Sequence, residues 1–199
     1  MTTKKKVLIG LGLVLLAYGA LVFGRILYFE SAEQTEAQVA KIHATKLTLA
    51  DVEGKSLPPD PGAEADKTVA GVDANKNGIR DDVELAIFAE YPNSAKTRAV
   101  LLQYALALQM EMTQPLVNTG TVVAVAQEKS KAAMCIAELT SRADLENFAK
   151  VTQGLTTFVK SAQLNNQPRD DAQRDFYTRL DSYSSLDETC DLDLSVFSN

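Results

Sequence analysis

Residues 73–84 read DANKNGIRDDVE, and the interpretation of the whole chain depends on this stretch. Counted from Asp73, oxygen-bearing side chains stand at positions 1, 3, 5, 9 and 12, and glycine stands at position 6. A calcium ion takes about six to eight oxygen ligands, so a short segment that binds it must wrap around it and present an oxygen at nearly every second residue. The spacing therefore predicts a calcium-binding loop that leads into a helix.

Five side chains and one main-chain carbonyl are the expected ligands. Gly78 allows the chain to turn back sharply, because a residue without a Cβ atom tolerates backbone angles that other residues avoid. Asp81 and Glu84 are three residues apart on the first turn of the following helix, so they point to the same side. The expected set comprises the side chains of Asp73, Asn75, Asn77, Asp81 and Glu84 and the carbonyl of Ile79.

This segment resembles the calcium loop of the EF-hand family at every side-chain ligand position. It differs from paired EF-hands because position 8 is Arg80, because the sequence has no second loop of this pattern, and because prolines rather than a helix precede it. The resemblance therefore implies a single structural site, similar to the loop-plus-helix calcium sites of extracytoplasmic bacterial proteins. Three charged ligands imply weak binding, with a dissociation constant of about 10⁻⁴–10⁻³ M.

An ion-free interpretation of the same stretch remains open. A tight turn followed by a helix would also place acidic residues here, because Asp81 and Asp82 suit the positive end of the helix dipole.

The N-terminus predicts a membrane anchor. Residues 7–24 carry no charge, and at 1.5 Å per residue they span about 27 Å, close to the hydrocarbon thickness of a bilayer. Lys4, Lys5 and Lys6 precede this run, so the positive-inside rule places the N-terminus in the cytoplasm and the remaining chain outside it. The alternative is a cleaved signal peptide and a secreted protein. A bacterial inner membrane with a periplasmic domain is the location we expect.

The remaining chain predicts an all-α fold. Residues 1–29 form the anchor, residues 30–70 a helix and a Pro-rich linker, and residues 71–199 the calcium loop and a bundle of about five helices. The linker is expected to be either a stalk or a segment packed on the domain. The bundle helices are expected at 81–91, 94–112, 121–139, from Ser141 and from Pro168, and the nearly all-apolar 94–112 is expected at the centre. Ser141 is expected to cap its helix.

Cys135 and Cys190 are the only cysteines of the chain. In an oxidising compartment they predict a disulfide that attaches the C-terminal tail to the bundle. Two unpaired buried thiols are the alternative. Their spacing excludes the CxxC motif of a redox catalyst.

Charge and motifs limit the possible functions. The chain has 20 basic and 26 acidic residues, and residues 1–29 contain four of the basic residues and none of the acidic ones. Residues 30–199 therefore carry 16 basic and 26 acidic side chains, a net charge of −10. Such a domain is unsuited to nucleic acid. We expect a membrane-anchored, calcium-binding structural or protein-interaction module that meets another envelope protein. A calcium-responsive switch is the alternative, and an envelope enzyme with structural calcium is less favoured because no acid lies in an apolar setting.

Overall fold

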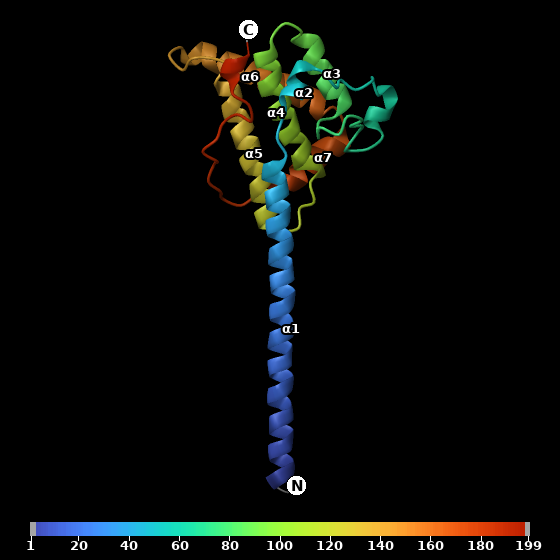
Figure 1. The fold of residues 1–199 in the computed structure, drawn as a ribbon, viewed down its shortest axis with the longest axis vertical. Coiled ribbons are helices and arrows are strands. Elements are labelled where there is room, and N and C mark those ends of the chain that lie inside the picture. The colour runs from blue at the N-terminus through green and yellow to red at the C-terminus, as the bar shows by residue number, and fades with distance from the viewer. Residues whose placement is uncertain (1–2, 198–199) are drawn as a thin grey trace. The chain divides into compact units, whose positions relative to one another are not determined.

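The computed structural model describes residues 3–197, without the side chains of residues 3–10 and 26–27. Every regular element in that part of the chain is a helix, which confirms the all-α prediction (Figure 1). Lys4, Lys5 and Lys6, the lysines expected on the cytoplasmic side, fall among the side chains that lie outside this description. The elements in chain order are α1 (Thr3–Ala44), α2 (Leu49–Glu53), the 3₁₀ helix η1 (Gly62–Asp66), α3 (Asp81–Glu90), α4 (Ala95–Thr113), α5 (Thr119–Ala137), α6 (Leu145–Gln163), α7 (Gln167–Thr178) and the 3₁₀ helix η2 (Leu194–Val196).

Helix α1 provides most of the first of two compact units, Met1–Ala40. Its length and apolar composition are sufficient to cross a bilayer, although a signal sequence would meet the same two criteria. The large apolar side chains described between Leu11 and Phe29 are exposed, and none of its most apolar window is buried within the described protein. By length and composition, the helix therefore suits a lipid environment.

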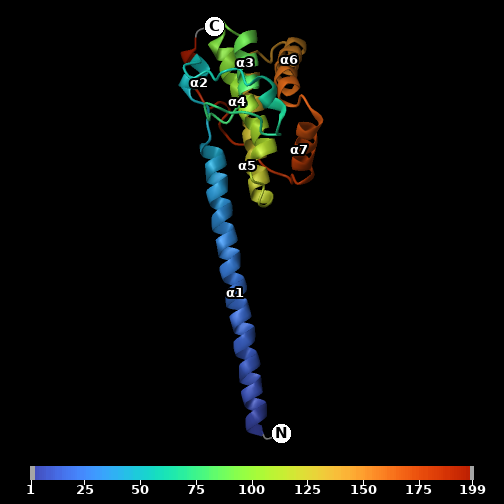
Figure 2. The ribbon, with the colours of Figure 1, turned by 90° about the vertical axis from the view of Figure 1, so that its right-hand side faces the viewer.

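The second unit, Lys41–Asn199, is built around α4. Every residue of α4 from Arg98 to Glu111 is buried, because helices α2, α3, α5, α6 and α7 all pack against it (Figures 1 and 2). The nearly all-apolar sequence of this helix predicts such a central position. Six α-helices follow α1 among the described residues, where the sequence predicts about five, and the short α2 is the addition.

The segment from Lys41 to residue 70, which includes the predicted linker, belongs to the second unit and packs against it. Thr48 caps α2 and forms a capping box with Asp51, and the following Val52 is fully buried. The Nε of Arg98 on α4 donates to the main-chain carbonyl of Val52 (3.1 Å). Of the two possibilities for this segment, packing on the domain is therefore the one found.

Side-chain caps define where most helices of the domain begin. Ser94 caps α4, Asn118 caps α5, and Asn166 caps α7 with Pro168 in its first turn. The predicted cap of α6 is wrong by three residues. Asp144 caps this helix by accepting the main-chain N–H of Asn147, whereas Ser141 accepts the N–H of Ala143 within the preceding turn.

A disulfide joins Cys135 on α5 to Cys190 in the C-terminal tail, with Cα atoms 4.9 Å apart. This confirms the predicted pairing. Beside it, the main-chain N–H of Asp191 donates to Gln103 Oε1 (3.0 Å), and Lys131 Nζ lies 2.5 Å from Asp191 Oδ1. The disulfide and these polar contacts together hold the tail against α4 and α5.

Candidate metal site

The loop between η1 and α3 folds around the side chain of Asp73. The main-chain N–H groups of Asn77 and Gly78 donate to Oδ1 and Oδ2 of Asp73 (3.1 and 2.9 Å). Two left-handed residues make this turn possible, Lys76 with φ of 60° and Gly78 with φ of 84°. The sharp turn that the sequence predicts at Gly78 is therefore present.

Asp81 closes the loop from its other end. Both carboxylate oxygens of Asp81 accept the main-chain N–H of Ala74 (3.0 and 3.2 Å), while the N–H of Asp81 donates to the carbonyl of Val72 (2.8 Å). Only 1% of Asp81 is exposed. Burial raises its pKa above the ordinary aspartate value, and the negative charges of Asp73 and Asp82 act in the same direction.

Glu84 lies one turn further along α3 and is 1% exposed. Its Oε2 accepts the side-chain amide N–H groups of Asn75 and Asn77, both at 3.0 Å. Burial raises the pKa of Glu84 to about 7, the two amide hydrogen bonds oppose this rise, and the charges of Asp51 and Asp81 add to it. The two asparagine side chains that bind this carboxylate are neutral. The expectation that no acid lies in an apolar setting is therefore wrong for Glu84, because the fold covers a helix position that the sequence alone does not show to be buried.

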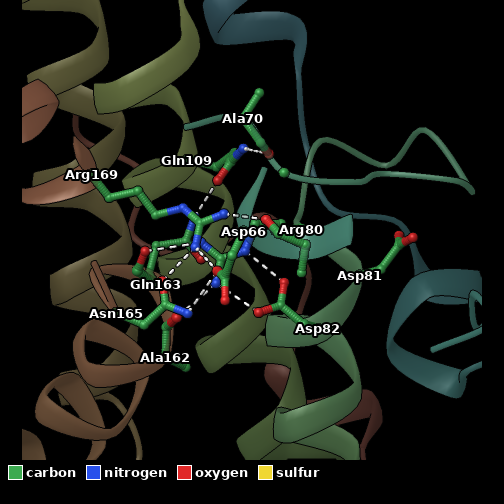
Figure 3. A network of polar contacts seen from close by, with 12 residues as sticks. Asp66, Ala70, Arg80, Asp81, Asp82, Gln109, Ala162, Gln163, Asn165 and Arg169 are labelled. Atoms are coloured by element: carbon green, nitrogen blue, oxygen red, sulfur yellow. Dashed lines mark hydrogen bonds and ion pairs between the residues drawn. The ribbon is translucent and has the colours of Figure 1, made fainter. Parts of the chain in front are cut away.

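No basic side chain within the described residues forms an ion pair with Asp73, Asp81 or Glu84. Arg80 lies between them in sequence, but its guanidinium points elsewhere, with Nε and Nη2 bound to the two carboxylate oxygens of Asp82 (2.6 and 2.7 Å). Figure 3 shows Asp81 turned away from that network. Within the described chain, the start of α3 therefore buries two acidic groups, Asp81 and Glu84, that have no ion-pair partner.

Three of the five predicted side-chain ligands lie in the loop, and Asp81 and Glu84 lie on the first turn of α3. Hydrogen bonds join Glu84 to the amides of Asn75 and Asn77, and Asp73 to the main chain of Asn77. Carboxylate and amide oxygens are ligands that calcium prefers, so the chemistry of the set fits that ion. In the structure, however, the Asn75 and Asn77 amides present nitrogen to Glu84, and Ile79 is fully buried with its N–H donating to Asn77 Oδ1 (2.8 Å). No group of three or more His, Cys, Asp or Glu residues within the described chain has an arrangement that would hold a metal. Ion binding therefore requires both amides to turn their oxygens inward.

Two fully buried arginines hold the flanks of the loop, and sequence reasoning did not identify this role. Besides Asp82, Arg80 donates to the carbonyls of Gln163 and Ala162 at the end of α6 (3.0 and 2.8 Å; Figure 3). These carbonyls have no partner within their own helix, so the guanidinium satisfies them. The signal available in the sequence was the arginine at position 8, where paired EF-hands have an apolar residue.

Arg169 on α7 plays the corresponding role for the segment before the loop. Its Nη1 pairs with Asp66 Oδ1 (2.6 Å), and its other nitrogens donate to the carbonyls of Val69, Thr68 and Ala65. Next to it, Gln163 donates to Gln109, whose amide donates to the carbonyl of Ala70 (2.8 Å; Figure 3). The network around Arg169 thus fixes an irregular segment where an EF-hand has an incoming helix.

Comparison with family models, with curated proteins and with solved structures finds no match to this chain.

Replacing Gly78 with alanine is expected to destabilise the domain by about 2–3 kcal/mol, since a left-handed non-glycine residue and an overfilled core each carry a penalty of about 1 kcal/mol or more. The added Cβ atom would lie 2.7 Å from Cδ1 of the buried Leu106. Gly62→Ala is the control, because Gly62 has φ of 52° but no atom within 4 Å of its added Cβ. Thermal melts of both variants test the difference, and equal shifts would contradict the packing argument.

Proposed function

We propose that this protein is a membrane-anchored, calcium-binding helical domain on the periplasmic side of a bacterial inner membrane, where it serves as a structural or protein-interaction module. The observation that carries the proposal is the pair of buried carboxylates, Asp81 and Glu84, which have no basic partner in the described chain. A buried carboxylate without a counter-charge is unfavourable, and its pKa rises as a result. A bound cation would restore the ionised form and supply the missing charge.

A structural role for the ion is favoured over a switch. The loop is held from outside by Arg80 and, through the preceding segment, by Arg169, so both of its flanks are fixed independently of an ion. Asn75 also donates to the carbonyl of Ser56 in the packed linker (3.0 Å). Calcium bound in this loop would join the linker, the loop and α3, and would stabilise the domain without a large rearrangement.

The proposed location combines two observations. The lysines before the apolar run of α1 favour a cytoplasmic N-terminus, and the disulfide between Cys135 and Cys190 favours an oxidising compartment for the domain. Both favour a location outside the cytoplasm for the residues after the anchor. Outside the cytoplasm, calcium-binding modules typically have dissociation constants of about 10⁻⁴–10⁻³ M, so the weak affinity expected here suits that compartment.

Calorimetric titration with calcium tests the site, using the full chain in lipid nanodiscs. The titration is done at about pH 7.5, because Glu84, with a pKa of about 7, is mostly ionised there. We expect saturable binding with a dissociation constant of about 10⁻⁴–10⁻³ M and a higher melting temperature with calcium than with chelator. Glu84→Gln is expected to abolish the binding. Glu90→Gln, at an exposed position near the end of the same helix, is the control and should bind as wild type. Absence of heat in the wild type would refute the calcium proposal.

Without calcium, the stability of the domain is expected to fall as pH rises from about 4.5 to above 7. The pKa of Glu84 is raised from 4.5 to about 7 on folding, so the folded state holds a proton that the unfolded state has released. The resulting stabilisation is complete below pH 4.5 and is lost as pH rises through 7. Glu84→Gln should remove the part of this dependence that Glu84 contributes, while Asp81, whose pKa is also raised, keeps its own contribution. At high pH the variant should be more stable than the chelator-treated wild type. Melts across this pH range measure both effects, and parallel profiles would contradict them.

A further inference from the structure

A groove of about 740 Å³ runs between α5 and α6, remote in sequence from the metal loop. Ala133, Met134 and Ala137 line its α5 side, and Phe148 and Ala149 begin its α6 side, which continues with threonine and glutamine side chains to Thr156. Most of this lining is apolar or small. At 1.5 Å per residue, the stretch from Phe148 to Thr156 gives the groove a length of about 12 Å, or two helical turns.

The sequence of α6 has a longer apolar stripe than the domain covers. Apolar residues recur at helical spacing through this helix, yet among its residues only Val159 and Gln163, near its C-terminal end, are buried. At the other end Leu145 is 71% exposed, and Met134 on the facing α5 is 41% exposed. Of this stripe, Phe148 lines the groove, whereas Leu145 lies outside its lining. The N-terminal half of α6 is therefore only partly covered by the described chain.

A single arginine lies at the end of the groove. Arg142, in the connection between α5 and α6, is the only charged residue of the lining, and its guanidinium stacks on the Phe148 ring at 5.6 Å from the centroid. Among the described residues no carboxylate forms an ion pair with it. An unpaired cation beside an apolar groove is notable, because residues 30–199 carry a net charge of −10.

We infer that this groove docks an amphipathic helix of a partner protein, with the apolar face in the groove and a carboxylate of the last turn against Arg142. The small side chains of the three lining alanines allow a third helix to approach α5 and α6 at normal packing distance. The C-terminal end of the docked helix carries the negative end of its dipole, which Arg142 would also attract. A second copy of this chain fits less well, since two domains of charge −10 repel each other. The inference rests on the proposed interaction function but not on calcium binding.

Two synthetic helical peptides of 18 residues test the groove. They share a leucine stripe and differ only in the last turn, which carries glutamate in one and lysine in the other. Fluorescence anisotropy is measured against the full chain in lipid nanodiscs, with empty nanodiscs as the blank. We expect saturable binding of the glutamate peptide and weaker binding of the lysine peptide.

Charge reversal identifies the contact. Arg142→Glu is expected to weaken binding of the glutamate peptide about tenfold, which corresponds to about 1.4 kcal/mol, and to strengthen binding of the lysine peptide. Lys150→Glu makes the same charge change at an exposed position on α6 outside the groove, and should alter neither affinity more than about twofold. Met134→Glu, which places a charge within the groove, should abolish binding of both peptides while the melting temperature stays near that of wild type.

Three results would overturn the docking inference. They are the absence of saturable binding of either peptide, equal effects of Arg142→Glu and Lys150→Glu, and occupation of the groove by sodium dodecanoate while neither peptide binds. Calcium titration of the same nanodisc preparation separates this failure from failure of the proposed function. Retained calcium binding without peptide binding refutes the groove alone.

Discussion

Replacing Arg80 with methionine is expected to lower the free energy of unfolding by about 3–5 kcal/mol, because two carbonyls at the end of α6 lose their donor and the partly exposed Asp82 loses its ion-pair partner. The Arg80 side chain is fully buried, and the variant would leave Asp82 and the carbonyls of Ala162 and Gln163 without their donor. Methionine keeps most of the side-chain length, so loss of polar contacts rather than loss of volume dominates. For a domain of this size, a melting temperature roughly 10 °C lower is expected.

Arg174→Met is the matched control for Arg80→Met. Arg174 on α7 also pairs with an aspartate, Asp171, but the two side chains are 67% and 59% exposed. An exposed pair of this kind contributes about 0–1 kcal/mol, so the control is expected to melt close to wild type. Similar losses in both variants would contradict the view that Arg80 stabilises the domain by satisfying the end of α6.

Replacing Cys135 and Cys190 together with serine is expected to destabilise the domain by about 4 kcal/mol on the chain-entropy argument. The disulfide closes a loop of 55 residues in sequence, and without it the unfolded chain gains conformational freedom. The polar contacts of the tail remain available, including Lys131 with Asp191 and Gln103 with the carbonyl of Thr189 (3.2 Å). We therefore expect a folded but less stable domain, with faster hydrogen exchange in residues 179–197.

Denaturant unfolding with and without a reducing agent measures the contribution of this disulfide. The wild type should lose about 4 kcal/mol on reduction, whereas the double serine variant should be insensitive to the reductant. The variant and the reduced wild type should then unfold at the same denaturant concentration. A wild type whose stability does not change on reduction would contradict a stabilising role for the disulfide.

The positions of the main helices follow from local features of the sequence. Side chains at Ser94, Asn118 and Asn166 cap α4, α5 and α7, and the apolar composition of 94–112 is that of a helix surrounded by others. The capping error at Ser141 has a local cause. Ser141 and Asp144 are both capping residues within one short turn, and the sequence does not show which of the two carries the main-chain angles of a cap.

The sequence alone predicts which residues belong to the candidate site, whereas their charge balance follows only from the tertiary structure. The spacing of residues 73–84 identifies the residues that gather in the loop, because a local turn brings them together. Their charge balance is not local. In the sequence, Arg80 lies among the acidic residues of the loop, where it could neutralise them. In the fold it pairs instead with Asp82 and with the end of α6, which leaves Asp81 and Glu84 without a cation among the described residues.

By itself the sequence determined the apolar N-terminal helix, the all-α domain with α4 at its centre, the paired cysteines and the turn at Gly78. Each of these depends on composition or on residues close together in the chain. Only the tertiary structure decided that the segment before the loop is packed, that Arg80 and Arg169 are buried, and that a groove stays open between α5 and α6. These features depend on contacts between residues far apart in sequence, such as Arg169 with Asp66, and a side chain reveals its burial only when the elements around it are in place.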